Sequence, residues 1–291
     1  NGQFDDVILG YDSVDSIQTQ PGHPGEPVGR NANRIGGAKF TLNGVTYELA
    51  KNSAEVNNLH SGPDLYHSRL WESWAYETAA LGTTITFGLH SPDGDQGYPG
   101  NADITVSYTL TPDNCLKLDY HMVSDADTIA NFTNHVYFNL GGYKSGSALD
   151  QKVWIDADYF TATDANSIPT GELVAVKGTP MDFTEMKPIG RDIQEDYQAL
   201  KYGNGYDHNW ALNHPAGELS LSAKAEDEKT GRTMEVYTDL PGVQFYTANS
   251  LKTERGKNHA VYTPRCGYCF ETQYFPDAIN KPEFASPVVK A

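Results

Sequence analysis

Alternation of apolar and polar residues is the feature of this sequence that most restricts its fold. The segment ADITVSYTLTPDNCLKLDYHMV carries the pattern twice, on either side of the turn residues TPDN. Because successive side chains of a strand point to opposite faces, this segment predicts two antiparallel strands joined by a turn. KFTLNGVTYELA predicts a second hairpin, which is closed by the dipeptide Asn43-Gly44.

Further alternating runs extend this interpretation over most of the chain. They occur in TTITFGLH, QKVWIDADYF, GELSLSAKA and RTMEVYTDL, whereas a helix is indicated only around IGRDIQEDYQAL, by Ile189, Ile193, Tyr197 and Leu200. No linker, repeat or low-complexity tract divides the sequence. We therefore expect an all-β protein: one large antiparallel β-sandwich with few short helices, in a single domain over residues 1–291.

The net charge and the cysteine content restrict the expected binding partners and the cellular compartment of the protein. The formal net charge is -17, which repels nucleic-acid phosphate and anionic membranes, so we expect a neutral ligand and neither nucleic acid nor a membrane as partner. No apolar run approaches the roughly 20 residues that span a bilayer, and the first residues lack the order of a signal peptide. The cysteines Cys115, Cys266 and Cys269 are too few for a disulfide framework, which favours a cytoplasmic protein.

Two segments set polar side chains among aromatic residues. If TNHVYFNLGG is a strand, His135, Tyr137 and Asn139 share one face of it. Similarly, GYCFETQYF places Glu271 on one face with Cys269 and Gln273. Burial among aromatic residues suits a carboxylate for proton transfer, although a histidine in such a setting is more often structural and a lone glutamate is often exposed.

Other motifs are better explained as structure. Cys266 and Cys269 form a C-x-x-C, but structural zinc usually requires a second pair or histidines, and a redox pair usually opens a helix. DGDQGYPGN begins like a calcium loop through Asp93 and Asp95 but lacks the acidic residue at the twelfth position, so a turn is favoured. The phosphate-binding, dinucleotide-binding and serine-hydrolase motifs are absent from the sequence.

Eight segments together resemble the aldose 1-epimerase (galactose mutarotase) family. They occur in the family's order between residues 30 and 282: GRNANRIGG, NNLHSGP, DGDQGYPGN, TNHVYFNLGG, IDADYFTATDANSIPTGELVAVKGTPMDF, YDHNWAL, PGVQFYTAN and ETQYFPDAINKP. The resemblance implies a galactose mutarotase-like supersandwich with an open sugar cleft and neither metal nor cofactor. It implies an isomerase that interconverts the α and β anomers of a neutral hexose such as galactose or glucose.

The resemblance also implies roles for individual residues. Glu271 of ETQ is similar to the family's base, and His135 of TNHVYFNL to its acid. The residues that resemble the family's sugar contacts are Asn33 and Arg34 of ANR, His60 of NLH, Asp207 of YDH and Gln244 of GVQFYT. Tyr137 or Trp210 would stack on the sugar, and we expect a monomer or a weak dimer.

Two departures from the family pattern and three alternatives stay open. The first residues, NGQFDDVILGYD, match a point inside the family pattern, so we expect the family's first N-terminal strands to be lacking. The chain also reads His60-Ser61-Gly62 where a second glycine is common after the histidine. The alternatives are a hexose-phosphate mutarotase, a glycoside hydrolase that uses Asp207 with Glu271, and a non-catalytic sugar-binding protein.

Overall fold

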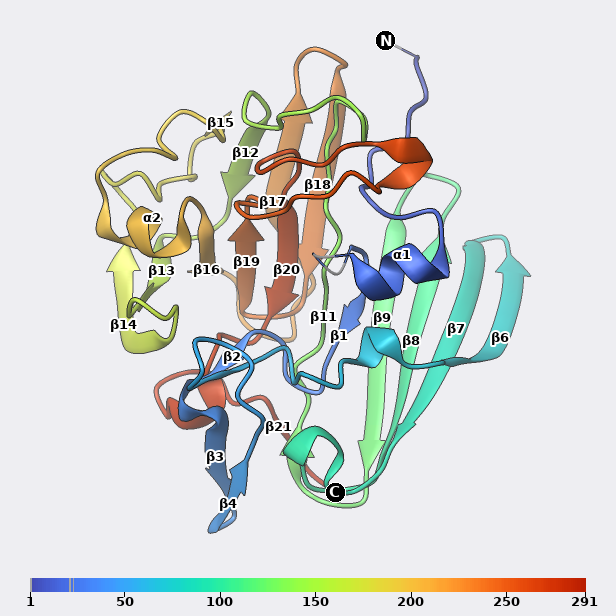
Figure 1. Ribbon diagram of the computed structural model, residues 1–291, viewed down its shortest axis with the longest axis vertical. Helices are drawn as coiled ribbons and strands as arrows, with labels where there is room; N and C mark the ends of the chain where they lie inside the picture. Colours follow the sequence, from blue (N-terminus) through green and yellow to red (C-terminus); the bar gives the residue numbers. More distant parts are fainter. Residues whose placement is uncertain (1, 21, 23) are drawn as a thin grey trace. The chain divides into compact units, whose positions relative to one another are not determined.

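The protein is described by a computed structural model for residues 2–20, 22 and 24–291, and its regular structure is mostly β (Figure 1). It folds as two compact units. The first contains the described residues up to Glu26 together with Thr133–Ala285, and the second contains Pro27–Phe132 and Ser286–Ala291. Among the described residues, no helix is long and apolar enough to cross a lipid bilayer.

The first unit contains two antiparallel sheets and both short α-helices that the structure describes. The larger sheet has the order β14-β13-β16-β19-β20 and the smaller one the order β15-β12-β17-β18. The helices are α1 (Val14–Thr19) and α2 (Gln198–Gly203). The strands are β11 (Thr133–Asn134), β12 (Lys152–Ile155), β13 (Tyr159–Thr163), β14 (Pro169–Ala175), β15 (Lys187–Pro188), β16 (Asp207–Ala211), β17 (Ser220–Asp227), β18 (Arg232–Thr238), β19 (Gly242–Tyr246) and β20 (Cys269–Gln273).

One hydrophobic core joins the two sheets of the first unit. Alternate residues of each strand point into it, and burial of their apolar surface is the main force that holds the layers together. Its members include Val153, Ile155, Ala223 and Ala225 from the smaller sheet and Phe160, Trp210, Val243, Phe245 and Phe270 from the larger one. The predicted all-β sandwich is confirmed in this unit.

The second unit is built on one four-stranded antiparallel sheet of order β6-β7-β8-β9. Three two-stranded pairs accompany it: β2–β5, β3–β4 and β10–β21. The strands are β1 (Pro27–Val28), β2 (Arg34–Ile35), β3 (Lys39–Leu42), β4 (Val45–Glu48), β5 (Asn58–Leu59), β6 (Glu72–Ala79), β7 (Gly82–Ser91), β8 (Ala102–Leu110), β9 (Leu116–Ser124), β10 (Thr128–Ile129) and β21 (Val288–Val289). Single 3₁₀ turns occur in both units, at Gly36–Ala38, Tyr66–Ser68, Asp95–Gly97, Lys257–His259 and Ala278–Asn280.

Both predicted hairpins are confirmed in the second unit. β3 and β4 pair through an Asn43-Gly44 turn whose φ angles are 51° and 79°, and β8 and β9 pair over their whole length. Positive φ at both central residues is the conformation that a tight two-residue hairpin requires, and Asn followed by Gly supplies it at low cost.

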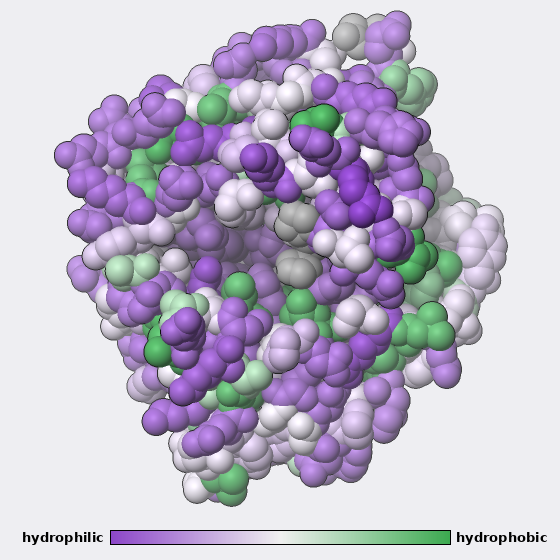
Figure 2. Space-filling model, viewed as in Figure 1, coloured by the Kyte–Doolittle hydropathy of each residue, from purple (hydrophilic) through white to green (hydrophobic). Residues whose placement is uncertain are grey.

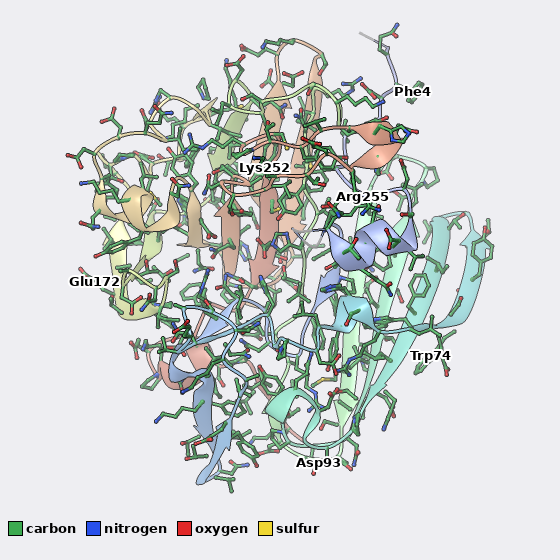
Figure 3. The ribbon with its side chains drawn as sticks, in the orientation of Figure 1. Phe4, Trp74, Asp93, Glu172, Lys252 and Arg255 are labelled. Atoms are coloured by element: carbon green, nitrogen blue, oxygen red, sulfur yellow. The ribbon has the colours of Figure 1, made fainter. Side chains whose placement is uncertain are left out.

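A close contact between two strands explains why β7 carries a glycine. The ring of Trp74 on β6, labelled in Figure 3, lies against Gly88 of β7. A Cβ atom at Gly88 would lie 1.9 Å from Cε2 of that ring, which is far inside van der Waals contact. Glycine therefore allows the large side chain to lie flat on its neighbouring strand.

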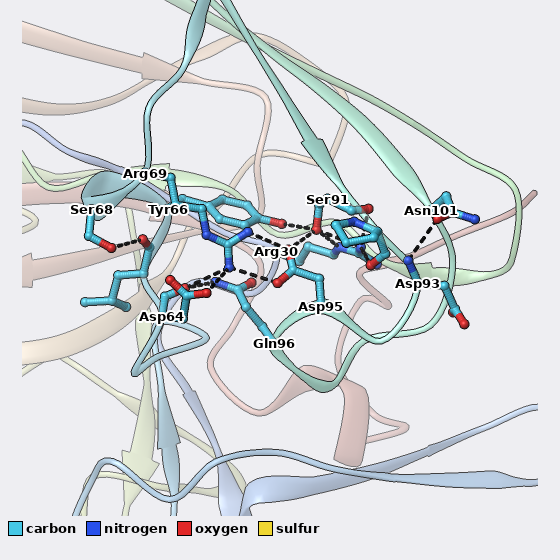
Figure 4. Close-up of polar contacts among 12 residues, drawn as sticks. Arg30, Asp64, Tyr66, Ser68, Arg69, Ser91, Asp93, Asp95, Gln96 and Asn101 are labelled. Atoms are coloured by element: carbon cyan, nitrogen blue, oxygen red, sulfur yellow. Dashed lines mark hydrogen bonds and ion pairs between the residues drawn. The ribbon is translucent and has the colours of Figure 1, made fainter.

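A buried arginine organises the loops of the second unit (Figure 4). The Arg30 guanidinium is 0% exposed and donates hydrogen bonds to the hydroxyl of Ser91, and also to Thr128 and to the carbonyl oxygens of Ser91, Pro92, Pro99 and Gly100. Ser91 in turn donates to Asp95, which Arg69 binds through both carboxylate oxygens at 2.6 and 2.8 Å. Although burial raises the pKa of Asp95, the bonds from Arg69 and Ser91 outweigh it and hold that pKa below its usual range.

The strand considered for TNHVYFNLGG forms only over its first residues. Strand β11 ends at Asn134, and Phe138 forms only isolated bridges to Ile8 and Tyr268. The backbone changes partner almost at each residue: Tyr137 accepts from Leu9, Phe138 donates to Tyr268, and Asn139 donates to Val7. Because no single neighbouring strand runs alongside it, the segment cannot continue a ladder.

The predicted helix around IGRDIQEDYQAL is also mostly wrong. Helix α2 begins only at Gln198, after most of the segment. The amide groups of Ile189 and Gly190 donate to the carbonyl oxygens of Gln151 and Leu149 and so are engaged outside any helix. Ile189, Ile193 and Leu200 are nevertheless buried, so the apolar spacing predicted burial correctly and the local backbone incorrectly.

Candidate active site

Three adjacent strands of the larger sheet, β16, β19 and the edge strand β20, bring polar residues into one row. In the antiparallel register Asn209 of β16 lies opposite Gln244 of β19, which lies opposite Glu271 of β20. Alternate residues on these strands, such as Trp210 and Phe245, point into the core. Since successive side chains alternate, the opposite face collects the polar groups. The prediction that Cys269, Glu271 and Gln273 share a face agrees with this register.

A buried carboxylate and a buried imidazole meet on the polar face. Nε2 of His135 lies 3.6 Å from Oε1 of Glu271, and the two residues are 6% and 2% exposed. The backbone of His135 is fixed on both sides, because its N–H donates to Glu26 and its carbonyl accepts from Gly25. These two predicted residues therefore form a buried pair of a carboxylate and an imidazole.

Aromatic rings and a thiol surround the imidazole. The ring of His135 lies 5.0 Å from that of Tyr137 and 6.1 Å from that of Tyr246, measured between centroids. Its Nδ1 lies 3.5 Å from Sγ of Cys269. Burial, followed by the nearby charges of Glu271 and Asp207, raises the pKa of the Cys269 thiol well above its usual value. Cys269 is therefore a neutral thiol at physiological pH.

A second carboxylate lies on the same sheet and is bound by an amide. Nε2 of Gln244 donates to Oδ1 of Asp207 at 2.7 Å. Asp207 begins β16 and lies opposite Tyr246 of β19. The strands of this sheet therefore carry three of the predicted site residues: Asp207, Gln244 and Glu271. Figure 2 shows that the surface over β19 and β20 is hollowed and hydrophilic.

The remaining predicted residues, Asn33, Arg34 and His60, meet one another in the second unit. β2 pairs with β5, so that Arg34 lies opposite Leu59, and the Asn33 N–H donates to Nδ1 of His60 at 3.0 Å. Because Nδ1 accepts that bond, the neutral His60 ring carries its proton on Nε2. Within the described residues, the buried Nε of Arg34 has no hydrogen-bond partner. Arg34 thus retains a donor that a ligand hydroxyl would satisfy.

One predicted contact is wrong, and two neighbours were missed. Trp210 is 0% exposed in the core, so it cannot stack on a ligand at the polar face; it follows Asp207 by an odd number of residues and so points the other way. The contact of Cys269 with His135 and the bonds of Gln273 were not assigned a role. Their place on the Glu271 face was the only signal that the sequence carried for them.

The three thiols differ sharply in exposure, which gives a measurable signature of this packing. Cys115 is exposed, whereas Cys266 and Cys269 are buried, and burial raises the pKa of Cys266 to about 11. We expect Ellman's reagent at about pH 8 to modify Cys115 rapidly in the native protein and the other two only after denaturation. The rapid phase should disappear in Cys115→Ser. Rapid native-state reaction of that variant would contradict the packing described around His135.

Comparison with known proteins links this arrangement to one family. Residues 1–291 match the family model described as aldose 1-epimerase. The chain is 40% identical to galactose mutarotase from Bos taurus over 291 residues, which cover 99% of this chain and 81% of that one. It is 34% identical to aldose 1-epimerase from Escherichia coli over 287 residues, or 99% and 81% of the two chains.

Solved structures agree with the sequence comparison. A galactose 1-epimerase from Lactobacillus acidophilus superposes with a TM-score of 0.85 at 26% identity, over 98% of this chain and 83% of the other. An aldose epimerase homologue from Caenorhabditis elegans gives 0.86 at 26% identity, with the same coverage. These two structures are similar to this chain in fold.

Proposed function

The chain belongs to the aldose 1-epimerase family, and from this membership we propose that it is an isomerase that interconverts the α and β anomers of a neutral hexose such as galactose or glucose. The observation that carries the assignment to residues is the buried pair of Glu271 and His135, 3.6 Å apart on the polar face of the larger sheet. Glu271 acts as the base and His135 as the acid.

The proposed reaction needs only proton transfers by these two groups. The Glu271 carboxylate takes the proton of the anomeric hydroxyl while protonated His135 gives a proton to the ring oxygen. The bond between C1 and the ring oxygen then breaks, which leaves an open-chain aldehyde. Rotation about C1–C2 and closure on the other face, with the two proton transfers reversed, give the other anomer. Each positioned group contributes about 10²–10⁴-fold.

The separation of the pair suits this chemistry. The oxygen that loses a proton and the oxygen that gains one are bonded to the same carbon of the sugar. An acid and a base that serve both must therefore lie within a few ångströms of each other, as Nε2 of His135 and Oε1 of Glu271 do. A general acid and base have to reach their substrate atoms at hydrogen-bond distance.

We assign the remaining predicted residues to sugar binding. Asp207 and Gln244 present a carboxylate and an amide from the larger sheet. The family resemblance supports the same role for Asn33, Arg34 and His60, whose side chains offer donors and acceptors. Hydroxyl groups are recognised by such fixed polar side chains, because an unmatched buried donor or acceptor costs more than a matched one contributes.

A neutral hexose is favoured over a hexose phosphate. Phosphate recognition usually uses a cluster of cationic side chains, and Arg34 is the only arginine or lysine among the candidate site residues. The formal net charge of -17 also disfavours an anionic substrate. We further propose that residues 1–291 act as a single family domain, as a monomer or weak dimer in the cytoplasm.

Polarimetry tests the proposed activity directly. Freshly dissolved α-D-galactose and α-D-glucose should approach their equilibrium rotation faster with the protein than without it. A phosphorylated hexose measured in parallel should show a smaller acceleration. If no neutral sugar is accelerated, the mutarotase assignment fails. Calorimetric binding of galactose in that case would instead indicate a sugar-binding protein.

The pH dependence of kcat tests the pairing of acid and base. One direction of ring opening requires Glu271 to be ionised and His135 to be protonated, so activity should fall at low pH as Glu271 gains a proton. It should fall at high pH as His135 loses one. After subtraction of the protein-free rate, we expect a bell-shaped profile whose two limbs belong to the coupled pair. Activity independent of pH between about pH 4 and about pH 9 would contradict these roles.

A further inference from the structure

Gln273, the last residue of β20, donates a hydrogen bond to the side-chain amide of Gln244. Its side chain is 0% exposed, and its Nε2 donates to Oε1 of Gln244 at 3.3 Å and to Oδ1 of Asn209 at 3.2 Å. Three buried amides on three adjacent strands are thus joined on the same face as Glu271. None of these bonds is needed to form the sheet, whose backbone groups pair independently.

A glycine makes this contact across the middle strand possible. Gln273 lies opposite Gly242 of β19 in the register, and Asn209 reaches the same place from the other side. A Cβ atom at Gly242 would lie 2.5 Å from Oδ1 of Asn209 and 2.8 Å from Cδ1 of Phe275. Glycine is therefore required here by the close approach of two side chains.

The polarity of these bonds decides which way the Gln244 amide faces. Oε1 of Gln244 accepts from Gln273, so Nε2 is directed to Asp207, to which it donates at 2.7 Å. The flipped amide would set two NH₂ groups against each other at one end and an oxygen against a carboxylate at the other. Gln273 thus adds to the effect of the Asp207 carboxylate, which can only accept, and favours the orientation in which Gln244 presents a donor to Asp207.

We propose that Gln273 is a positioning residue for sugar binding, which acts through Gln244 on Asp207 and takes no part in proton transfer. The proposal rests on the proposed function, because Gln244 and Asp207 are its sugar contacts. A residue that only orients binding groups affects substrate and transition state equally, so its loss raises KM and leaves kcat nearly unchanged. Loss of a residue that only maintains the fold is not expected to raise KM selectively while kcat stays unchanged.

Gln273→Met removes the donor and keeps a side chain of similar length. We expect KM for galactose to rise about three- to tenfold and kcat to change less than about twofold. Thr272→Val, on the opposite face of the same strand, is the matched control and should leave both constants unchanged. A fall in kcat with unchanged KM in Gln273→Met would overturn the proposal.

A double-mutant cycle tests whether Gln273 affects KM through Gln244 or independently of it. If Gln273 acts only by orienting that amide, Gln273→Met should have little further effect on KM in the Gln244→Ala background, within about twofold. Independent, multiplying effects on KM would overturn the proposal. Should Gln273→Met fail to fold, Gly242→Ala, whose Cβ would displace the Asn209 amide that Gln273 binds, is expected to raise KM in the same way and replaces it in the cycle.

Measurements of turnover and sugar binding on the wild-type protein distinguish failure of this proposal from failure of the proposed function. If it accelerates mutarotation, the KM cycle decides the role of Gln273. If it does not accelerate mutarotation but binds galactose, the mutarotase assignment fails and the same cycle, measured as Kd by calorimetry, decides it. If the wild type neither accelerates mutarotation of galactose or glucose nor binds either sugar, both proposals are overturned.

Discussion

Replacing Glu271 by Gln is expected to lower kcat for mutarotation by about 10²–10⁴-fold while KM changes little. The substitution keeps the size and shape of the side chain and removes only its ability to accept and return a proton. Because Glu271 is 2% exposed and lies 3.6 Å from His135, water cannot readily replace the missing base. Polarimetry on α-D-galactose, compared with the protein-free rate, measures the effect.

Glu172→Gln is the matched control for that experiment. Glu172 is an exposed residue of β14, at the opposite edge of the same five-stranded sheet from β20, as its label in Figure 3 indicates. The same chemical change there should leave kcat within about twofold of the wild type. A Glu271→Gln protein that folds normally and retains wild-type kcat would remove Glu271 from the role of base.

The polar face of β20 was predictable from the sequence because it depends on alternation alone. Glu271, Gln273 and Cys269 are separated by even numbers of residues, so they share a face wherever β20 lies. The same rule, applied to Asp207 and Trp210, excludes Trp210 from that face. The stacking role expected for Trp210 was wrong because it was inferred from the motif YDHNWAL, without regard to the alternation of side chains along the strand.

What the sequence left open depends on contacts between distant segments. His135 occupies its position through backbone bonds to Gly25 and Glu26 and a side-chain contact with Cys269, all remote in the chain. The bond of Gln273 to Gln244 depends on the register of β19 against β20, and the position of the Asn209 amide depends on the missing side chain of Gly242. Local pattern predicts which face a residue occupies, but register and irregular backbone are fixed only by tertiary packing.

Replacing Arg30 by Met is expected to destabilise the protein by about 3–5 kcal/mol, as measured by urea unfolding followed by circular dichroism. Arg30 is completely buried, and its guanidinium satisfies the carbonyl oxygens of Pro92, Pro99 and Gly100, as well as groups of Ser91 and Thr128. Methionine fills similar space but donates nothing. The loop carbonyls would then be buried without partners.

Two further variants distinguish the stabilising effect of the hydrogen bonds of Arg30 from the effect of its positive charge. Arg30→Lys keeps the charge but presents one compact ammonium in place of a planar fork, so it should cost less than Arg30→Met and more than zero. Lys229→Met removes a cation whose partner, Asp150, is as exposed as itself, and should leave the free energy of unfolding nearly unchanged. Equal effects of Arg30→Met and Lys229→Met would show that the network around Arg30 and Ser91 does not hold these loops.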